Sequence, residues 1–158
     1  MSIRVLISNR INVYAEGLRR LLEEAVDSTG PAMTCKIAAP EASVRPPPVD
    51  LIVSDAACFG RWAGCGRKIL LIWDTPQSLP PIGELKELVD KGLAGIVDAE
   101  LDPALLQKAV TRIHAGELWI DHRIIQDSLS SMSSASSTHL SRREYDVLQH
   151  ICNGCSNK

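Results

Sequence analysis

The sequence contains no apolar run that approaches the roughly 20 residues of a membrane-spanning helix. Its opening residues, Met-Ser-Ile-Arg, also lack the apolar stretch of a secretory signal peptide. We therefore expect a cytoplasmic protein with no membrane partner.

A large net charge is missing as well. The chain carries 17 Lys and Arg against 19 Asp and Glu, which gives a formal net charge of −2. Such a chain has no overall basic field for nucleic acid, so any DNA binding must come from a small separate module. With 158 residues, 45% of them hydrophobic, the chain can form one globular domain of about 120 residues plus an appendage.

The cysteines give little support for a metal or redox centre. There are five of them, an odd number, and reduced thiols are the usual state in the cytoplasm. Cys152 and Cys155 have the Cys-x-x-Cys spacing of zinc and redox sites, but no second pair or suitably spaced histidines accompany them. We expect no metal and no cofactor, and a redox or metal pair at these two cysteines is the alternative.

Short apolar runs alternate with helical patterns along the first 118 residues. The expected strands are Ile3–Ile7, Thr34–Ala38, Leu51–Ser54, Lys68–Trp73 and Ala94–Val97. Helical spacing of apolar residues covers Tyr14–Ala25, Ile82–Val89 and Pro103–His114, and Asp102 is the expected cap of the last helix. The proline-rich segment Pro40–Pro48 cannot be a regular helix. This alternation predicts an α/β fold, a flavodoxin-like doubly wound parallel sheet of five strands in the order 2-1-3-4-5.

A linker follows this domain. Gly116–Ser130 has the pattern of a short helix, and Ser128–Thr138 contains seven serines in eleven residues. So polar a stretch cannot bury enough apolar surface to order itself. We therefore divide the chain into residues 1–118, a linker at 119–139 and a C-terminal segment at 140–158.

The C-terminal segment begins with a helix start signal. Ser141 and Glu144 form a capping box, and Leu140 and Tyr145 fit the accompanying hydrophobic staple. The segment resembles the first helix and turn of LuxR-type helix-turn-helix domains. The matching residues are Leu140, Ser141, Arg143, Glu144, Val147, Leu148, Gly154, Ser156, Asn157 and Lys158. The resemblance implies DNA binding through the complete C-terminal domain. Residues up to Lys158 stop before the helix that enters the major groove, so we expect no sequence-specific DNA binding from them alone.

The first domain resembles the receiver domain of NarL/FixJ-family response regulators. Ile3–Leu22 is similar to the opening strand and helix of the family, and Val49–Asp55 to the strand that leads to the phosphoacceptor aspartate, here Asp55. Gly92–Ala99 and Ala115–Trp119 resemble the segments around the last strand and the receiver exit. The resemblance covers essentially the whole chain and implies a regulator of transcription in a two-component system.

The receiver pocket departs from the pattern of the family at four positions. The two acidic metal ligands correspond to Asn9 and Arg10, the switching Thr or Ser to Trp73, and the phosphate-pairing lysine to Ala99. One remaining carboxylate is a poor magnesium site, and Arg10 places a positive charge where the metal would lie. We therefore expect Asp55 to cap its strand end or pair with Arg10, and we expect neither phosphorylation nor input from a histidine kinase. Asn9 and Arg10 could instead hold an anion or a small ligand.

The sequence therefore predicts an atypical response regulator that is not an enzyme. Its output would depend on homodimerisation, a regulatory protein or a small ligand. The candidate dimer surface is formed by the helices at Tyr14–Ala25 and Pro103–His114, which should lie side by side. Three alternatives stay open: a conventional regulator phosphorylated at Asp55, a receiver-like protein-interaction module, and a small flavodoxin-like enzyme. No Gly-x-Gly loop follows the first strand, which counts against the enzyme.

Overall fold

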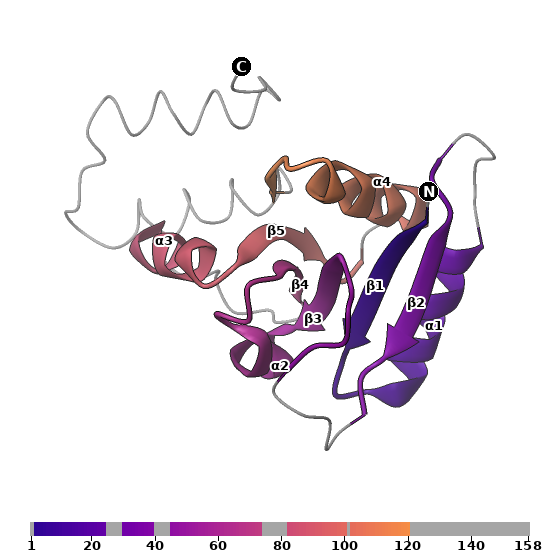
Figure 1. Ribbon diagram of the computed structural model, residues 1–158, viewed down its shortest axis with the longest axis horizontal. Helices are drawn as coiled ribbons and strands as arrows, with labels where there is room; N and C mark the ends of the chain where they lie inside the picture. The colour runs from indigo at the N-terminus through magenta and orange to yellow at the C-terminus, as the bar shows by residue number, and fades with distance from the viewer. Residues whose placement is uncertain (1, 25–29, 40–44, 74–81, 101, 121–158) are drawn as a thin grey trace.

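The computed structural model describes residues 2–24, 30–39, 45–73, 82–100 and 102–120 (Figure 1). These residues form a parallel sheet in the order β2-β1-β3-β4-β5-β6. The strands are β1 (Ile3–Ser8), β2 (Met33–Ile37), β3 (Leu51–Asp55), β4 (Lys68–Trp73), β5 (Leu93–Asp98) and β6 (Trp119–Ile120). The expected flavodoxin-like architecture and the order of its first five strands are confirmed.

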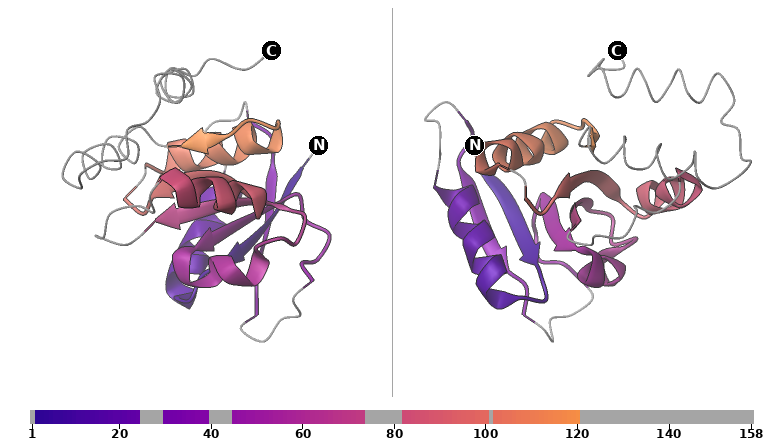
Figure 2. Two further views of the ribbon diagram at one scale, coloured as in Figure 1. Left: turned by 90° about the vertical axis from the view of Figure 1, so that its left-hand side faces the viewer. Right: turned by 180° about the vertical axis from the view of Figure 1, so that it is seen from behind.

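Helices cover both faces of the sheet (Figure 2). They are α1 (Asn12–Glu23), α2 (Ala56–Trp62), α3 (Ile82–Asp90) and α4 (Pro103–His114). The side chain of Asp102 accepts a hydrogen bond from the backbone N–H of Ala104, and Pro103 is the first helical residue, so α4 begins as the sequence predicts. In the part of the chain that the structure describes, no helix is long and apolar enough to cross a bilayer.

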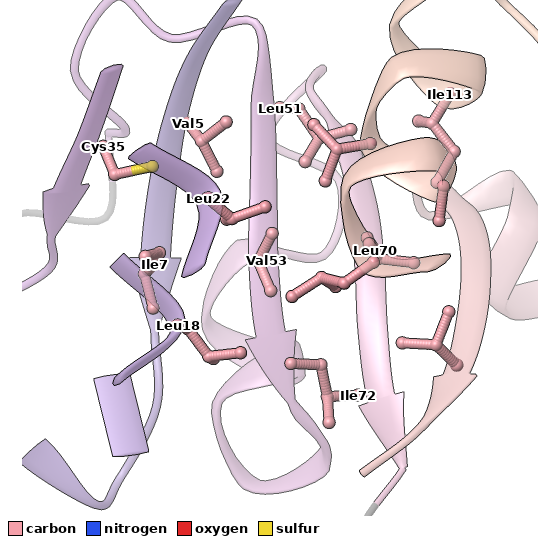
Figure 3. Packing of buried hydrophobic residues seen from close by; sticks show 14 of the residues in the cluster. Val5, Ile7, Leu18, Leu22, Cys35, Leu51, Val53, Leu70, Ile72 and Ile113 are labelled. Atoms are coloured by element: carbon pink, nitrogen blue, oxygen red, sulfur yellow. The ribbon is translucent and has the colours of Figure 1, made fainter. Parts of the chain in front are cut away.

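Two apolar layers form the core. One layer lies under α1 and α4, and Figure 3 shows its buried side chains, among them Val5, Leu18, Leu22, Val53, Leu70, Ile72 and Ile113. The other lies under α2 and α3 and includes Leu6, Ile52, Phe59, Trp62, Leu71 and Ile96. Both faces of β1, β3 and β4 are therefore buried, which explains why these strands read as continuous apolar runs.

The helices α1 and α4 lie side by side, as expected for this strand order. The side-chain amide of Gln107 on α4 donates hydrogen bonds to the backbone oxygens of Leu21 and Glu24 at the end of α1. The last carbonyls of a helix have no partner within it, so Gln107 satisfies two of these groups from a neighbouring helix.

The sixth strand corrects the expected number of strands, which was five, and the expected start of the linker helix. Trp119–Ile120 was expected to belong to a linker helix over Gly116–Ser130, but it pairs with β5 and extends the sheet past residue 118. The pairing depends on Gly95, since a Cβ atom there would lie 2.7 Å from the Cδ1 atom of Ile113 and 2.7 Å from the backbone oxygen of Trp119. The other predicted parts of the linker, and the helix-turn-helix start at 140–158, lie outside the described residues.

Candidate functional site

The residues predicted to form the degenerate pocket gather at one edge of the sheet. Asn9 and Arg10 follow β1, Asp55 ends β3, Trp73 ends β4 and Ala99 follows β5. Parallel strands place all of these positions at the carboxyl edge, where ligands bind in doubly wound folds. Hydrogen bonds donated by backbone N–H groups connect two pairs of these residues. The N–H of Arg10 donates to the Oδ2 atom of Asp55 over 2.9 Å, and the N–H of Ala99 donates to the oxygen of Trp73 over 3.0 Å.

Asp55 is buried, with 2% of its surface exposed, and both of its carboxylate oxygens accept hydrogen bonds. Oδ1 accepts from the backbone N–H of Cys58 over 2.7 Å and so caps the start of α2, while Oδ2 accepts from Arg10. Asp55 was expected to cap the end of its strand, whereas in the structure its carboxylate caps the start of the following helix. In the hydrogen bond between Arg10 and Asp55, the donor is the backbone N–H group of Arg10.

Cys58 was not singled out from the sequence, although it faces Asp55. Burial raises the pKa of the Cys58 thiol, and the hydrogen bond to the Asp55 carboxylate raises it further. The thiol is therefore held in its protonated form, which is a poor nucleophile. The only available signal was its position, three residues after a capping aspartate.

Asn9 supports the chain between β1 and α1. Its side-chain oxygen accepts a hydrogen bond from the backbone N–H of Ile11 over 2.8 Å, which is the local turn that Asn side chains favour. Ile11 is the N-cap of α1 and its side chain makes no capping hydrogen bond. Asn9 therefore has a conformational role in leading the chain into the helix.

The residues predicted for the pocket do not fit a magnesium ion. Magnesium requires oxygen ligands in nearly octahedral geometry and binds proteins through carboxylates. Asp55 is the one carboxylate among the residues predicted for the pocket, and both of its oxygens are already engaged by backbone N–H groups. Over the described residues, no three His, Cys, Asp or Glu side chains are grouped so that they could hold a metal.

Trp62 and Trp73 have different environments. Trp62, the last residue of α2, is completely buried against the apolar layer on that face of the sheet. Trp73 is half-buried and packs against the apolar layer on that same face of the sheet. Ala99 packs on the opposite layer, and its backbone oxygen accepts a hydrogen bond from the hydroxyl of Tyr14 over 3.2 Å. This bond links α1 to the end of β5.

A groove that the sequence did not indicate opens beside this edge. It has a volume of about 420 Å³ and lies between α1, the start of α4 and the ends of β4 and β5. Two apolar side chains of α1 and its cap, Val13 and Ile11, are exposed there by 84% and 51%. The sequence gives no sign of the groove, because it arises from the separation of two helices that are distant along the chain.

Solved structures of response regulators share this fold. ChrA, a response regulator of a haem-sensing two-component system, is 20% identical with a TM-score of 0.58, over 98% of this chain and 77% of that one. A LuxR-family two-component response regulator from Aurantimonas sp. SI85-9A1 is 19% identical with a TM-score of 0.64, over 84% and 99%. RcsB, solved as dimers bound to DNA, is 14% identical with a TM-score of 0.58, over 98% and 78%. No protein-family model and no curated protein matches the sequence.

Proposed function

We propose that this chain is an atypical response regulator that controls transcription without phosphorylation of its receiver domain. The fold is that of response regulators, and the C-terminal residues 140–158 have the pattern of a LuxR-type DNA-binding domain. In this proposal, dimerisation, a regulatory protein or a small ligand sets the output. DNA is contacted through the complete C-terminal domain.

The observation that supports this proposal most strongly is the state of Asp55. Phosphoryl transfer is catalysed mainly by positioning and by neutralising the charge that develops on the phosphoryl oxygens. Here the carboxylate that would attack is buried and its two oxygens hold backbone N–H groups. The neighbouring positions contribute Asn9, Arg10 and Ala99 in place of two acidic ligands and a lysine. Attack on phosphorus would break the cap of α2, and the described residues contain no group of metal ligands that could compensate.

The proposed partners are a second copy of the chain and DNA. RcsB, which shares the fold, is known as dimers on DNA. In the present chain, α1 and α4 form one continuous surface because Gln107 joins them, and this surface carries exposed apolar side chains such as Val13 and Leu105. Exposed apolar side chains on paired helices are typical of surfaces that associate.

Intact-mass spectrometry tests the proposal directly. The chain is incubated with acetyl phosphate and magnesium, beside a conventional response regulator as positive control. We expect the control to gain one phosphoryl group and this chain to keep its mass. Stoichiometric addition of a phosphoryl group that is lost in an Asp55→Asn variant would overturn the proposal and favour a conventional regulator.

A further inference from the structure

The strand β2 forms one outer side of the sheet, and among the described residues no strand lies beyond it (Figure 1). In a parallel pair, the backbone groups of alternate residues face the neighbouring strand. The backbone oxygen of Ala32 accepts a hydrogen bond from the N–H of Ile3. The N–H of Ala38 donates to the backbone oxygen of Ile7, so the even-numbered residues of this segment face β1. The backbone groups that point away from the sheet belong to Met33, Cys35 and Ile37.

Two copies of β2 fit one another in antiparallel orientation. With the two Cys35 residues opposite each other, Met33 of one copy lies opposite Ile37 of the other. The remaining pair is Thr34 with Lys36, so no like charges lie opposite each other. All three outward residues of each strand would then pair, and Ile37, which is 37% exposed, would be covered. The outer side of β2 is therefore complementary to itself.

The side chain of Glu23 occupies the middle of this outer side. Glu23 is the last residue of α1, and its Oε1 atom accepts a hydrogen bond from the backbone N–H of Cys35 over 3.0 Å. A carboxylate oxygen thus lies where the carbonyl oxygen of an added strand would have to bind. The other oxygen, Oε2, accepts from the Nη1 atom of Arg19, which is one turn earlier on the same helix. Arg19 therefore holds the carboxylate across the strand.

We propose that Glu23 closes the outer side of β2 against the addition of a strand from a second copy of the chain. A hydrogen bond to an ionised group is about twice as strong as one between neutral groups. A strand that displaced Glu23 from the N–H of Cys35 would therefore exchange a stronger bond for a weaker one. The closure goes beyond the proposed function, because it concerns a surface other than α1 and α4. It leaves the surface of these two helices as the route by which copies of the chain associate.

Sedimentation equilibrium of the complete 158-residue chain tests the closure. Leu105→Glu serves as the background, because a charge at this exposed position on α4 opposes association through the helices. In this background Glu23→Ala removes the acceptor of the Cys35 N–H and should raise the association constant at least tenfold. Glu24→Ala is the matched control, since it removes the same charge from the next, exposed residue and should leave the constant unchanged. Equal effects of the two variants, or no effect of Glu23→Ala, would overturn the proposal.

A conservative variant separates the hydrogen bond from the charge. Glu23→Gln removes the negative charge but keeps a side-chain oxygen that can accept from the N–H of Cys35. We expect its association constant to equal that of the Leu105→Glu background. If Glu23→Gln associates as strongly as Glu23→Ala, the hydrogen bond does not close the strand and the proposal is wrong.

A proline locates the association on β2. The N–H of Ile37 points away from β1, so Ile37→Pro removes a donor from the outer side without breaking the pairing of β1 and β2. Added to Glu23→Ala, it should return the association constant to that of the background, and circular dichroism confirms that each variant is folded. Association that persists after Ile37→Pro would place the contact elsewhere and overturn the proposal. Phosphorylation of Asp55, by contrast, would remove the proposed function and leave this result unchanged.

Discussion

The Nε2 atom of Gln107 donates a hydrogen bond over 2.8 Å to the backbone oxygen of Glu24, at the C-terminal end of α1. The same nitrogen donates to the backbone oxygen of Leu21. A side chain of α4 thus supplies hydrogen-bond donors to the carbonyl groups at the C-terminal end of α1. The surface proposed for dimerisation is therefore assembled only when the two ends of the domain have met.

Replacement of Gln107 should weaken the contact between α1 and α4. Gln107→Ala leaves two helix-end carbonyls without their side-chain partner, and we expect the free energy of unfolding to fall by about 1–2 kcal/mol. Urea denaturation followed by circular dichroism measures the change. Lys108→Ala is the control, since Lys108 is the exposed neighbour on the same helix and should change stability by less than about 0.5 kcal/mol. Equal effects of the two variants would contradict the role assigned to Gln107.

The proposed dimer surface can be tested with one charge on each face of the sheet. Leu105 on α4 is 41% exposed and Val89 on α3 is 42% exposed, so glutamate at either position costs little in the monomer. We expect sedimentation equilibrium to show association of the parent chain that Leu105→Glu weakens and Val89→Glu does not. A strict monomer throughout the concentration series would remove constitutive dimerisation and leave a switch by a partner or a ligand.

The two hydrogen bonds of Asp55 predict different effects for two substitutions. Asp55→Ala loses the cap of α2 and the partner of the Arg10 N–H, and should lower the free energy of unfolding by about 1–3 kcal/mol. Asp55→Asn retains one acceptor oxygen, which can still serve the N–H of Cys58, and should lose about 1 kcal/mol. Denaturant unfolding compares the variants. If Asp55→Ala is no less stable than Asp55→Asn, capping is not what Asp55 contributes.

The surface ion pair between Arg4 and Asp50 should make the stability of the chain depend on pH in the acid range. The Arg4 side chain lowers the pKa of Asp50 from its ordinary value of 3.8 to about 2, and the backbone N–H of Arg4 adds to the effect. Because the pKa is lower in the folded state, the stabilisation is present above pH 3.8 and is lost as the pH falls to about 2. The stability advantage of the parent chain over Asp50→Asn should shrink through this interval.

The variant Arg4→Met separates the two contributions to the Asp50 pKa. It removes the guanidinium but keeps the backbone N–H that donates to Oδ2 of Asp50 over 2.9 Å. We expect its stability to vary with pH less than that of the parent and more than that of Asp50→Asn. A parent chain and an Asp50→Asn variant with the same acid response would show that the pair has no effect on stability.

Local pattern predicts most of this fold. The strand at Lys68–Trp73 was expected over the range found, because a buried apolar run lies between glycine-rich and proline-containing segments. The start of α4 was predictable from Asp102 and Pro103 for a similar reason, since both signals act within one helical turn. The carboxyl-edge position of Asn9, Asp55 and Ala99 followed from the parallel strand order.

The features that the sequence did not reveal depend on distant contacts. The strand β6 has two residues, too few for any periodic pattern, and it forms because Gly95 leaves room for it. The groove arises from the distance between α1 and α4, and neither the exposure of Val13 nor the open space at Gly17 can be read from a helical pattern. Apolar residues at helical spacing are interpreted as the buried face of a helix, so this reasoning does not identify an apolar residue that is exposed.

The small strand beside Gly95 also bears on aggregation. An unpaired strand edge is a template on which other chains can add strands, and natural proteins commonly limit that risk with very short edge strands. Here β5, with six residues, is covered at Gly95 and Ile96 by β6, which offers only two residues to the outside. Any replacement of Gly95 adds a Cβ that collides with Trp119, so it would displace this cover. The glycine therefore limits the length of strand edge that β5 leaves open to other chains.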